Sequence, residues 1–179
     1  MNCPFSNRLT KSSVFQCLAG LSSRKVALII TLSSVIALLG AFIAQYIFNL
    51  HPCELCLIQR IPFALNIILG VTAFFWASRQ RLLIGLSGIS FLVNSGIALF
   101  HSGVERKWWA GLTGCTTPDM SGSIEDLMKR IQETAVVRCD EIPWSFMGLS
   151  MANYNIVFCL GLAVLIAAYL LGSYHKRSA

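Results

Sequence analysis

Four long apolar runs constrain the fold of this chain more than any other feature. They cover residues 26–50, 61–78, 82–104 and 152–174, and none of them contains Asp, Glu, Lys or Arg. An α-helix rises about 1.5 Å per residue and the hydrocarbon core of a bilayer is about 30 Å thick, so each run has the length of a membrane span. The sequence therefore predicts an all-α membrane protein with a bundle of four transmembrane helices.

The composition and the first run agree with this prediction. Charged residues make up 12% of the chain, whereas soluble domains carry about 25%. The run over residues 26–50 is longer than the apolar core of a signal peptide, which has about 7–15 residues, so we expect a retained helix. Residues 1–25 and 175–179 are expected to be polar tails, and Pro62 is expected in the first turn of the second helix.

Charge placement predicts the topology. Eight basic residues lie in the two tails and in the short turn between the second and third helices, and all eight acidic residues lie in the other two loops, about residues 51–60 and 105–151. Because basic residues accumulate on the cytoplasmic side of a membrane, both tails should be cytoplasmic and both loops external. This one-sided basicity also explains the net charge of +6, and we find no element that would read nucleic acid.

The second external loop carries the pattern of a short amphipathic helix. Ser123 is a suitable N-cap, and Ile124, Leu127, Met128 and Ile131 then recur at helical spacing. We expect this helix to end near residue 136 and to rest its apolar face on the membrane surface or on the mouth of the bundle.

Two pairs of cysteines lie in the external loops. Cys53 and Cys56 are separated by two residues, whereas Cys115 and Cys139 are far apart. A tight pair forms a strained and readily reduced disulfide, which favours a redox couple. The sequence leaves three alternatives open: a structural disulfide at the tight pair, a zinc site of all four thiols, and a simple disulfide staple at the wide pair. Haem attachment is excluded because Leu57 follows Cys56 where a histidine is required.

Two further residues are candidates for binding an electron acceptor. Arg60 follows Cys56 by four residues, so on a helix both lie on one face. His101 ends the third apolar run on the same side of the membrane. A thiol, an arginine and a histidine at one depth suit the head group of a quinone that arrives through the lipid. Taken singly, Arg60 and His101 also fit ordinary interfacial side chains.

Between residues 26 and 174, the chain resembles the DsbB family of bacterial membrane proteins for disulfide bond formation. Three motifs carry the resemblance: Cys53-x-x-Cys56-x-x-Gln59-Arg60, His101-x-Gly103-Val104-Glu105, and Cys139-Asp140-Glu141-Ile142-Pro143-Trp144. The order of the pairs, tight before wide, distinguishes it from the vitamin K epoxide reductase family.

The resemblance implies a quinone-dependent thiol oxidase in the bacterial inner membrane, with its cysteine loops in the periplasm. Cys115 and Cys139 would oxidise a DsbA-like thioredoxin-fold partner, Cys139 would pass the electrons to Cys53, and Cys56 would reduce the quinone. Arg60 and His101 would bind the quinone, with ubiquinone preferred over menaquinone, and no metal is expected. The alternative is a non-catalytic membrane scaffold with structural disulfides or a metal site of four cysteines.

Overall fold

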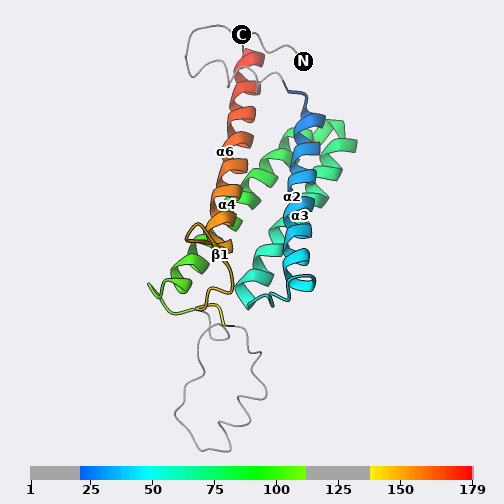
Figure 1. Ribbon diagram of the computed structural model, residues 1–179. Helices are drawn as coiled ribbons and strands as arrows, with labels where there is room; N and C mark the ends of the chain where they lie inside the picture. Colours follow the sequence, from blue (N-terminus) through cyan, green and yellow to red (C-terminus); the bar gives the residue numbers. More distant parts are fainter. Residues whose placement is uncertain (1–20, 112–137, 179) are drawn as a thin grey trace, which may run out of the picture.

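The computed structural model describes residues 21–111 and 138–178 of the chain (Figure 1). Four helices are long and apolar enough to cross a membrane. They are α2 (Ser23–Tyr46), α3 (Glu54–Phe75), α4 (Gln80–Glu105) and α6 (Met151–Ser178). The predicted all-α, four-helix membrane protein is thus confirmed. The expected amphipathic helix near residues 123–136 and Cys115 lie outside the described residues.

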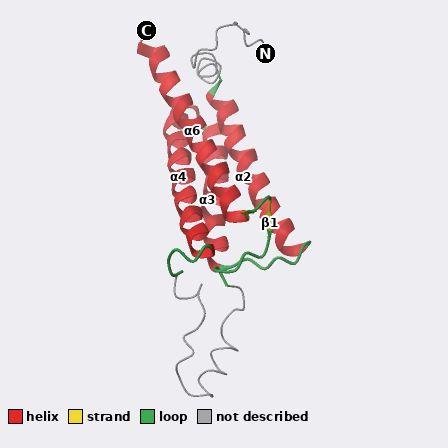
Figure 2. Cartoon of the chain, turned by 60° about the vertical axis from the view of Figure 1, so that its left-hand side comes forward, coloured by secondary structure: helices red, strands yellow, loops and turns green. Residues whose placement is uncertain are grey.

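The helices run up and down a common axis, as Figure 2 shows. Helix α3 packs between α2 and α4, and α6 packs against α4. The start of α2 and the end of α6 lie at one end of the bundle, while the start of α3 and the end of α4 lie at the other (Figure 1). A short 3-10 helix, η1 (Ala77–Arg79), joins α3 to α4.

Small residues allow the helices to approach closely. A Cβ atom on Gly70 of α3 would overlap Thr31 and lie 3.1 Å from the Ala27 carbonyl oxygen of α2. A Cβ atom on Gly88 of α4 would lie 3.0 Å from Ile166 of α6. Close backbone approach is a usual means of helix association in lipid, where no hydrophobic effect drives helices together.

The outer face of the bundle is apolar. Ile36, Ile68 and Val157 are 65%, 63% and 70% exposed on three different helices. Large apolar side chains exposed in this number are costly in water and favourable in hydrocarbon. The exposed belt therefore matches a lipid-facing surface.

The start of α3 differs from our expectation. The helix begins at Glu54, not near residue 61, and Cys53 is its N-cap. Pro62 consequently lies inside the helix, so its predicted place in the first turn is wrong. Helix α2 also lies closer to the N-terminus than expected, because it ends at Tyr46 and not near residue 50. Asn49, in the connection that follows, adopts a positive φ of 52°.

A two-stranded hairpin precedes α6. Strands β1 (Ser145–Phe146) and β2 (Leu149–Ser150) are antiparallel, and Ser145 pairs with Ser150. The Ser150 hydroxyl donates a hydrogen bond of 2.5 Å to the buried Glu105 carboxylate at the end of α4. This bond ties the hairpin to the bundle end where α3 begins.

Candidate functional site

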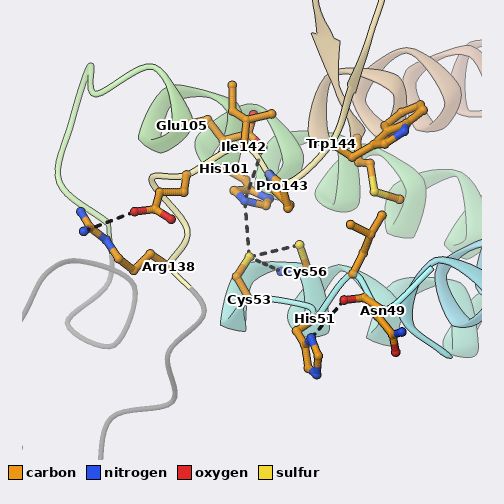
Figure 3. Close-up of a pocket in the computed structure, with 13 residues that line it drawn as sticks. Asn49, His51, Cys53, Cys56, His101, Glu105, Arg138, Ile142, Pro143 and Trp144 are labelled. Carbon is orange, nitrogen blue, oxygen red and sulfur yellow. Dashed lines mark hydrogen bonds and ion pairs between the residues drawn. The ribbon is translucent and has the colours of Figure 1, made fainter. Parts of the chain in front are cut away.

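The tight cysteine pair forms the first turn of α3. Cys53 caps the helix, and its sulfur accepts a hydrogen bond of 3.4 Å from the backbone N–H of Cys56. The Cys53 thiol donates a hydrogen bond to the Cys56 sulfur, with 3.1 Å between the two Sγ atoms (Figure 3). Both residues are thiols here, and a small approach of the two sulfurs would close a disulfide of about 2.05 Å.

His101 lies directly against this pair. It sits in the last turn of α4 and is 4% exposed. Its Nε2 atom is 3.5 Å from Cys53 Sγ and 3.8 Å from Glu105 Oε1. Figure 3 shows the imidazole pointing toward the cysteine pair, with a dashed line that joins it to the Cys53 sulfur. The structure thus brings Cys53, Cys56 and His101 together from the ends of two helices.

Two amide side chains determine which nitrogen of His101 carries the proton. Asn155 Nδ2 of α6 donates a hydrogen bond of 2.6 Å to Gln59 Oε1, and Gln59 Nε2 donates one of 2.9 Å to His101 Nδ1. Because Nδ1 is an acceptor in this arrangement, the neutral ring carries its proton on Nε2. That N–H faces the sulfur of Cys53.

Cys53 holds its thiol proton tightly. The hydrogen bond that its thiol donates to Cys56, together with burial, raises the pKa of Cys53 to about 12. His101 acts in the opposite direction, because an imidazole beside the sulfur favours the thiolate and lowers this pKa. Cys53 therefore stays protonated at neutral pH and presents the Cys56 sulfur as the acceptor of its hydrogen bond.

An apolar cleft of about 500 Å³ opens beside Cys56. It is lined mostly by apolar side chains of α2, α3 and α6, such as Ile36 and Phe158, and its polar groups include Gln59, Arg60 and His101. A largely apolar cavity with a few convergent polar groups is the usual form of a small-molecule site. We call this space the apolar cleft.

Arg60 is held at the edge of this cleft by α2. Its Nη1 donates a hydrogen bond of 2.7 Å to Gln45 Oε1, and its guanidinium lies 5.1 Å from the centre of the Phe42 ring. These two contacts fix a cation one turn along α3 from Cys56, as its spacing in the sequence suggested.

A second space, the mouth cavity, has a volume of about 280 Å³ and lies at the end of the bundle (Figure 3). Cys53 and Cys56 line it together with Glu105 and Arg138. Cys56 also lines the apolar cleft, whereas the lining of that cleft does not include Cys53. The two sulfurs thus differ in which space they reach.

Cys139 approaches the pair from the second loop. It is 1% exposed and belongs to the same buried cluster as Cys53, Leu55 and Val104. Beside it, Arg138 donates two hydrogen bonds, of 2.9 and 2.6 Å, to the Asp140 carboxylate, and this contact lowers the pKa of Asp140. Of the six residues predicted from the sequence, five therefore lie at one end of the bundle, and Cys115 lies outside the described residues.

Four polar residues of this site were not predicted from the sequence: Gln59, Glu105, Ser150 and Asn155. Gln59 and Glu105 lie inside two of the motifs described above. An acidic or amide residue at the edge of an apolar run can itself indicate a functional site. Their partners could not be foreseen, because each contact joins segments distant in the sequence.

A scan against family models matches residues 23–169 to the description "Disulfide bond formation protein DsbB". The chain belongs to the DsbB family. A match over this range includes α2, α3 and α4, most of α6 and both described cysteine segments. The chain is therefore a multi-pass membrane protein that takes part in disulfide bond formation. Its family name implies thiol–disulfide oxidoreductase activity.

Curated relatives agree with this assignment. "Disulfide bond formation protein B" of Xanthomonas euvesicatoria is 33% identical over 69% of this chain and 76% of its own length. The protein of the same name from a Polaromonas species is 28% identical over 79% and 86% of the two chains. An uncharacterized protein, RP370, of Rickettsia prowazekii is 27% identical over 80% and 85%. No solved structure matches the chain.

Proposed function

We propose that this protein re-oxidises a DsbA-like thioredoxin-fold partner in the periplasm and passes the electrons to a membrane quinone, ubiquinone in preference to menaquinone. The observation that carries the proposal is the division between the two sulfurs of the tight pair. Cys53 belongs to the same buried cluster as Cys139 and lines the mouth cavity, whereas Cys56 packs against that cluster and lines both the mouth cavity and the apolar cleft. A relay that takes electrons from one side and delivers them to another requires this arrangement.

The first half of the relay is thiol–disulfide exchange. A thiolate of the partner attacks the Cys115–Cys139 disulfide at Cys115, and the second partner thiol resolves the mixed bond, so the partner leaves oxidised. The released Cys139 thiolate attacks Cys53 of the Cys53–Cys56 disulfide, and Cys56 leaves as a thiolate. Cys115 then displaces Cys53 from Cys139, which restores the loop disulfide and leaves Cys53 and Cys56 reduced.

The second half returns the tight pair to the disulfide. A quinone bound in the apolar cleft would supply the acceptor for two electrons and two protons and would be released as quinol. Arg60 supports this step as a fixed donor to a carbonyl oxygen of the acceptor, because Gln45 and Phe42 hold its guanidinium in place. The N–H of His101, whose Nε2 atom lies 3.5 Å from Cys53 Sγ, favours the thiolate form of Cys53 when its proton leaves.

The charge pattern supports the placement in the cell. The basic tails and turn favour a cytoplasmic location for the start of α2 and the end of α6. The cysteine end of the bundle would then face the periplasm, an oxidising compartment in which disulfides persist. The bacterial inner membrane supplies both the quinone pool and access to exported proteins.

A turnover assay tests the proposal. The purified protein in lipid, given ubiquinone or menaquinone, should oxidise a reduced DsbA-like partner with one quinol formed per partner disulfide. Cys56→Ser should abolish turnover, and Cys3→Ser with Cys17→Ser is the matched control that should leave it unchanged. Unchanged turnover by the Cys56→Ser variant would refute the relay and favour a scaffold with structural disulfides.

A further inference from the structure

The reduced cysteine pair and His101 form a compact set of metal-ligating atoms. Among the described residues, the two Sγ atoms and a ring nitrogen of His101 all lie within 4.8 Å of one another. Cys53 and His101 are 5% and 4% exposed, and Cys56 is half-buried. Three soft or borderline ligands converge on one point beside the mouth cavity.

The distances suit a tetrahedral zinc-type cation. With Zn–S of about 2.3 Å and Zn–N of about 2.0 Å, tetrahedral angles place sulfur and nitrogen about 3.5 Å apart and two sulfurs about 3.8 Å apart. The distance from Cys53 Sγ to His101 Nε2 is 3.5 Å, and that between the two sulfurs is 3.1 Å. The edge from Cys53 Sγ to His101 Nε2 already fits, and the edge between the two sulfurs must open slightly. The third edge, from Cys56 Sγ to the imidazole, lies within the 4.8 Å that holds all three ligand atoms.

We propose that the reduced protein binds a thiophilic divalent cation of the zinc class through Cys53 Sγ, Cys56 Sγ and His101 Nε2. Two thiol protons leave on binding, and no electrons are transferred. Two thiolates neutralise the charge of the cation, so the buried site carries no net charge, which favours binding away from water. Each thiolate donates a lone pair to the cation, and that lone pair is then not available for attack on another sulfur. The bound cation therefore keeps the two cysteines reduced.

The amide pair beside His101 can serve this metal-bound state as well. A ring that binds metal through Nε2 must carry its proton on Nδ1, and that N–H requires an acceptor. Rotation of the Gln59 amide by half a turn replaces the Nε2 donor, now 2.9 Å from His101 Nδ1, with the Oε1 acceptor. The same rotation of Asn155 keeps the 2.6 Å contact between the two amides satisfied.

The fourth position of the cation opens toward the mouth cavity. Solvent can occupy it, as in zinc sites with three protein ligands. Glu105 Oε1, 3.8 Å from His101 Nε2, is near enough to accept a hydrogen bond from a bound water. The proposed ligands do not include Cys115, which distinguishes this site from a site of four cysteines.

Cobalt(II) is a suitable probe, because thiolate ligation produces charge-transfer absorption and tetrahedral geometry produces strong visible bands. The parent protein is the full chain with Cys3→Ser and Cys17→Ser, reduced and held in lipid without quinone. It should bind one cobalt ion with thiolate absorption, and zinc should displace that ion. Cys56→Ser should abolish the thiolate signal, and His101→Ala should abolish the tetrahedral bands, whereas Cys115→Ser should change neither.

Two variants at Gln59 test its hydrogen bond with His101 in opposite directions. Gln59→Leu removes the acceptor for the His101 N–H and should weaken cobalt binding by about tenfold to a hundredfold. Gln59→Glu supplies a carboxylate acceptor and should strengthen it, a result that misfolding cannot produce. Absence of thiolate absorption in the reduced parent, indifference to His101→Ala, or loss of binding in Cys115→Ser would each overturn the proposal.

The consequence for turnover rests on the proposed function and is measured apart from binding. Zinc should inhibit oxidation of the partner, and a chelator should restore it. Because cobalt binding is read without quinone or partner, its failure would leave the thiol oxidase proposal intact. Conversely, an inactive oxidase that still bound cobalt through these three residues would leave the metal site standing.

Discussion

At the scale of single residues, the site depends on how tightly Cys53 holds its proton. Cys53 donates to Cys56, and this hydrogen bond is the largest of the influences that raise its pKa to about 12. A thiol reacts with alkylating agents as the thiolate. In the reduced protein, alkylation of Cys53 should therefore keep rising with pH beyond the ordinary thiol value of 9.0.

The control for this pH profile is Cys56→Ala, which removes the acceptor of the hydrogen bond. The pKa of Cys53 should then fall toward the ordinary value, because the largest cause of the rise is gone. Rates measured by mass spectrometry of the Cys53 peptide should level off at lower pH in the variant. Identical profiles for the two proteins would contradict the assigned direction of the hydrogen bond.

A variant at Arg60 should separate the proposed binding of quinone from the proposed binding of partner. A hydrogen bond to a charged group contributes about 1.5–3 kcal/mol, so Arg60→Ala should raise the Michaelis constant for quinone by about tenfold to a hundredfold. The Michaelis constant for the partner should not change. Gln45→Ala removes only the side chain that accepts the 2.7 Å bond from Arg60, so its effect should be smaller. A raised constant for the partner alone would argue against this role.

At the scale of helices, the close crossing of α2 and α3 fixes the position of the apolar cleft between them. Gly70→Leu would place a side chain against Thr31 and the Ala27 carbonyl, and overpacking of this kind costs about 1–3 kcal/mol. Gly96→Leu is the matched control, because nothing lies within 4 Å of a Cβ atom there. Unfolding in detergent should show a loss of stability for Gly70→Leu and little change for Gly96→Leu. Equal effects would mean that α2 and α3 do not cross this closely.

The number of helices could be predicted from the sequence, but the start of α3 could not. A helix that crosses a bilayer needs about 20 apolar residues, so each of the four runs can be recognised as a span from its length. The start of a helix is usually recognised by Ser, Thr, Asp or Asn at the N-cap, whereas the N-cap of α3 is Cys53. Pro62, a residue typical of a first helical turn, wrongly suggested a later start. The early start matters for the site, because it makes the tight pair a helical turn rather than part of a loop.

The contacts among helices were likewise beyond prediction. Gln59 and Asn155 are separated by 96 positions, and whether they meet depends on the rotation of α3 and α6 about their axes. A pattern of apolar residues specifies the lipid-facing side only coarsely when helices are apolar all round. Cys53, Cys56 and Arg60 were recognisable because their spacing lies within one helix, while the amide pair that orients His101 was not.

At the scale of the whole molecule, the direction of the bundle in the membrane determines whether the relay can operate. Every described cysteine of the site lies at the end where α3 begins, and the opposite end carries Arg24, Lys25, Arg79 and Arg81. Moving basic residues across a bilayer is unfavourable, so the end that carries them should remain in the cytoplasm. The cysteine end would then meet an oxidising compartment and exported partners.

Reporter fusions test this orientation directly. Alkaline phosphatase, which is active only after export, should be active when fused after residue 110 and inactive when fused after residue 79. A fluorescent protein joined to the C-terminus should fluoresce from the cytoplasmic side. Arg79→Glu together with Arg81→Glu should reduce the asymmetry of charge and yield a mixed population, since the turn is short and its basic residues count fully. The reverse pattern of reporter activity would place the cysteines in a reducing compartment, where a disulfide relay could not be sustained.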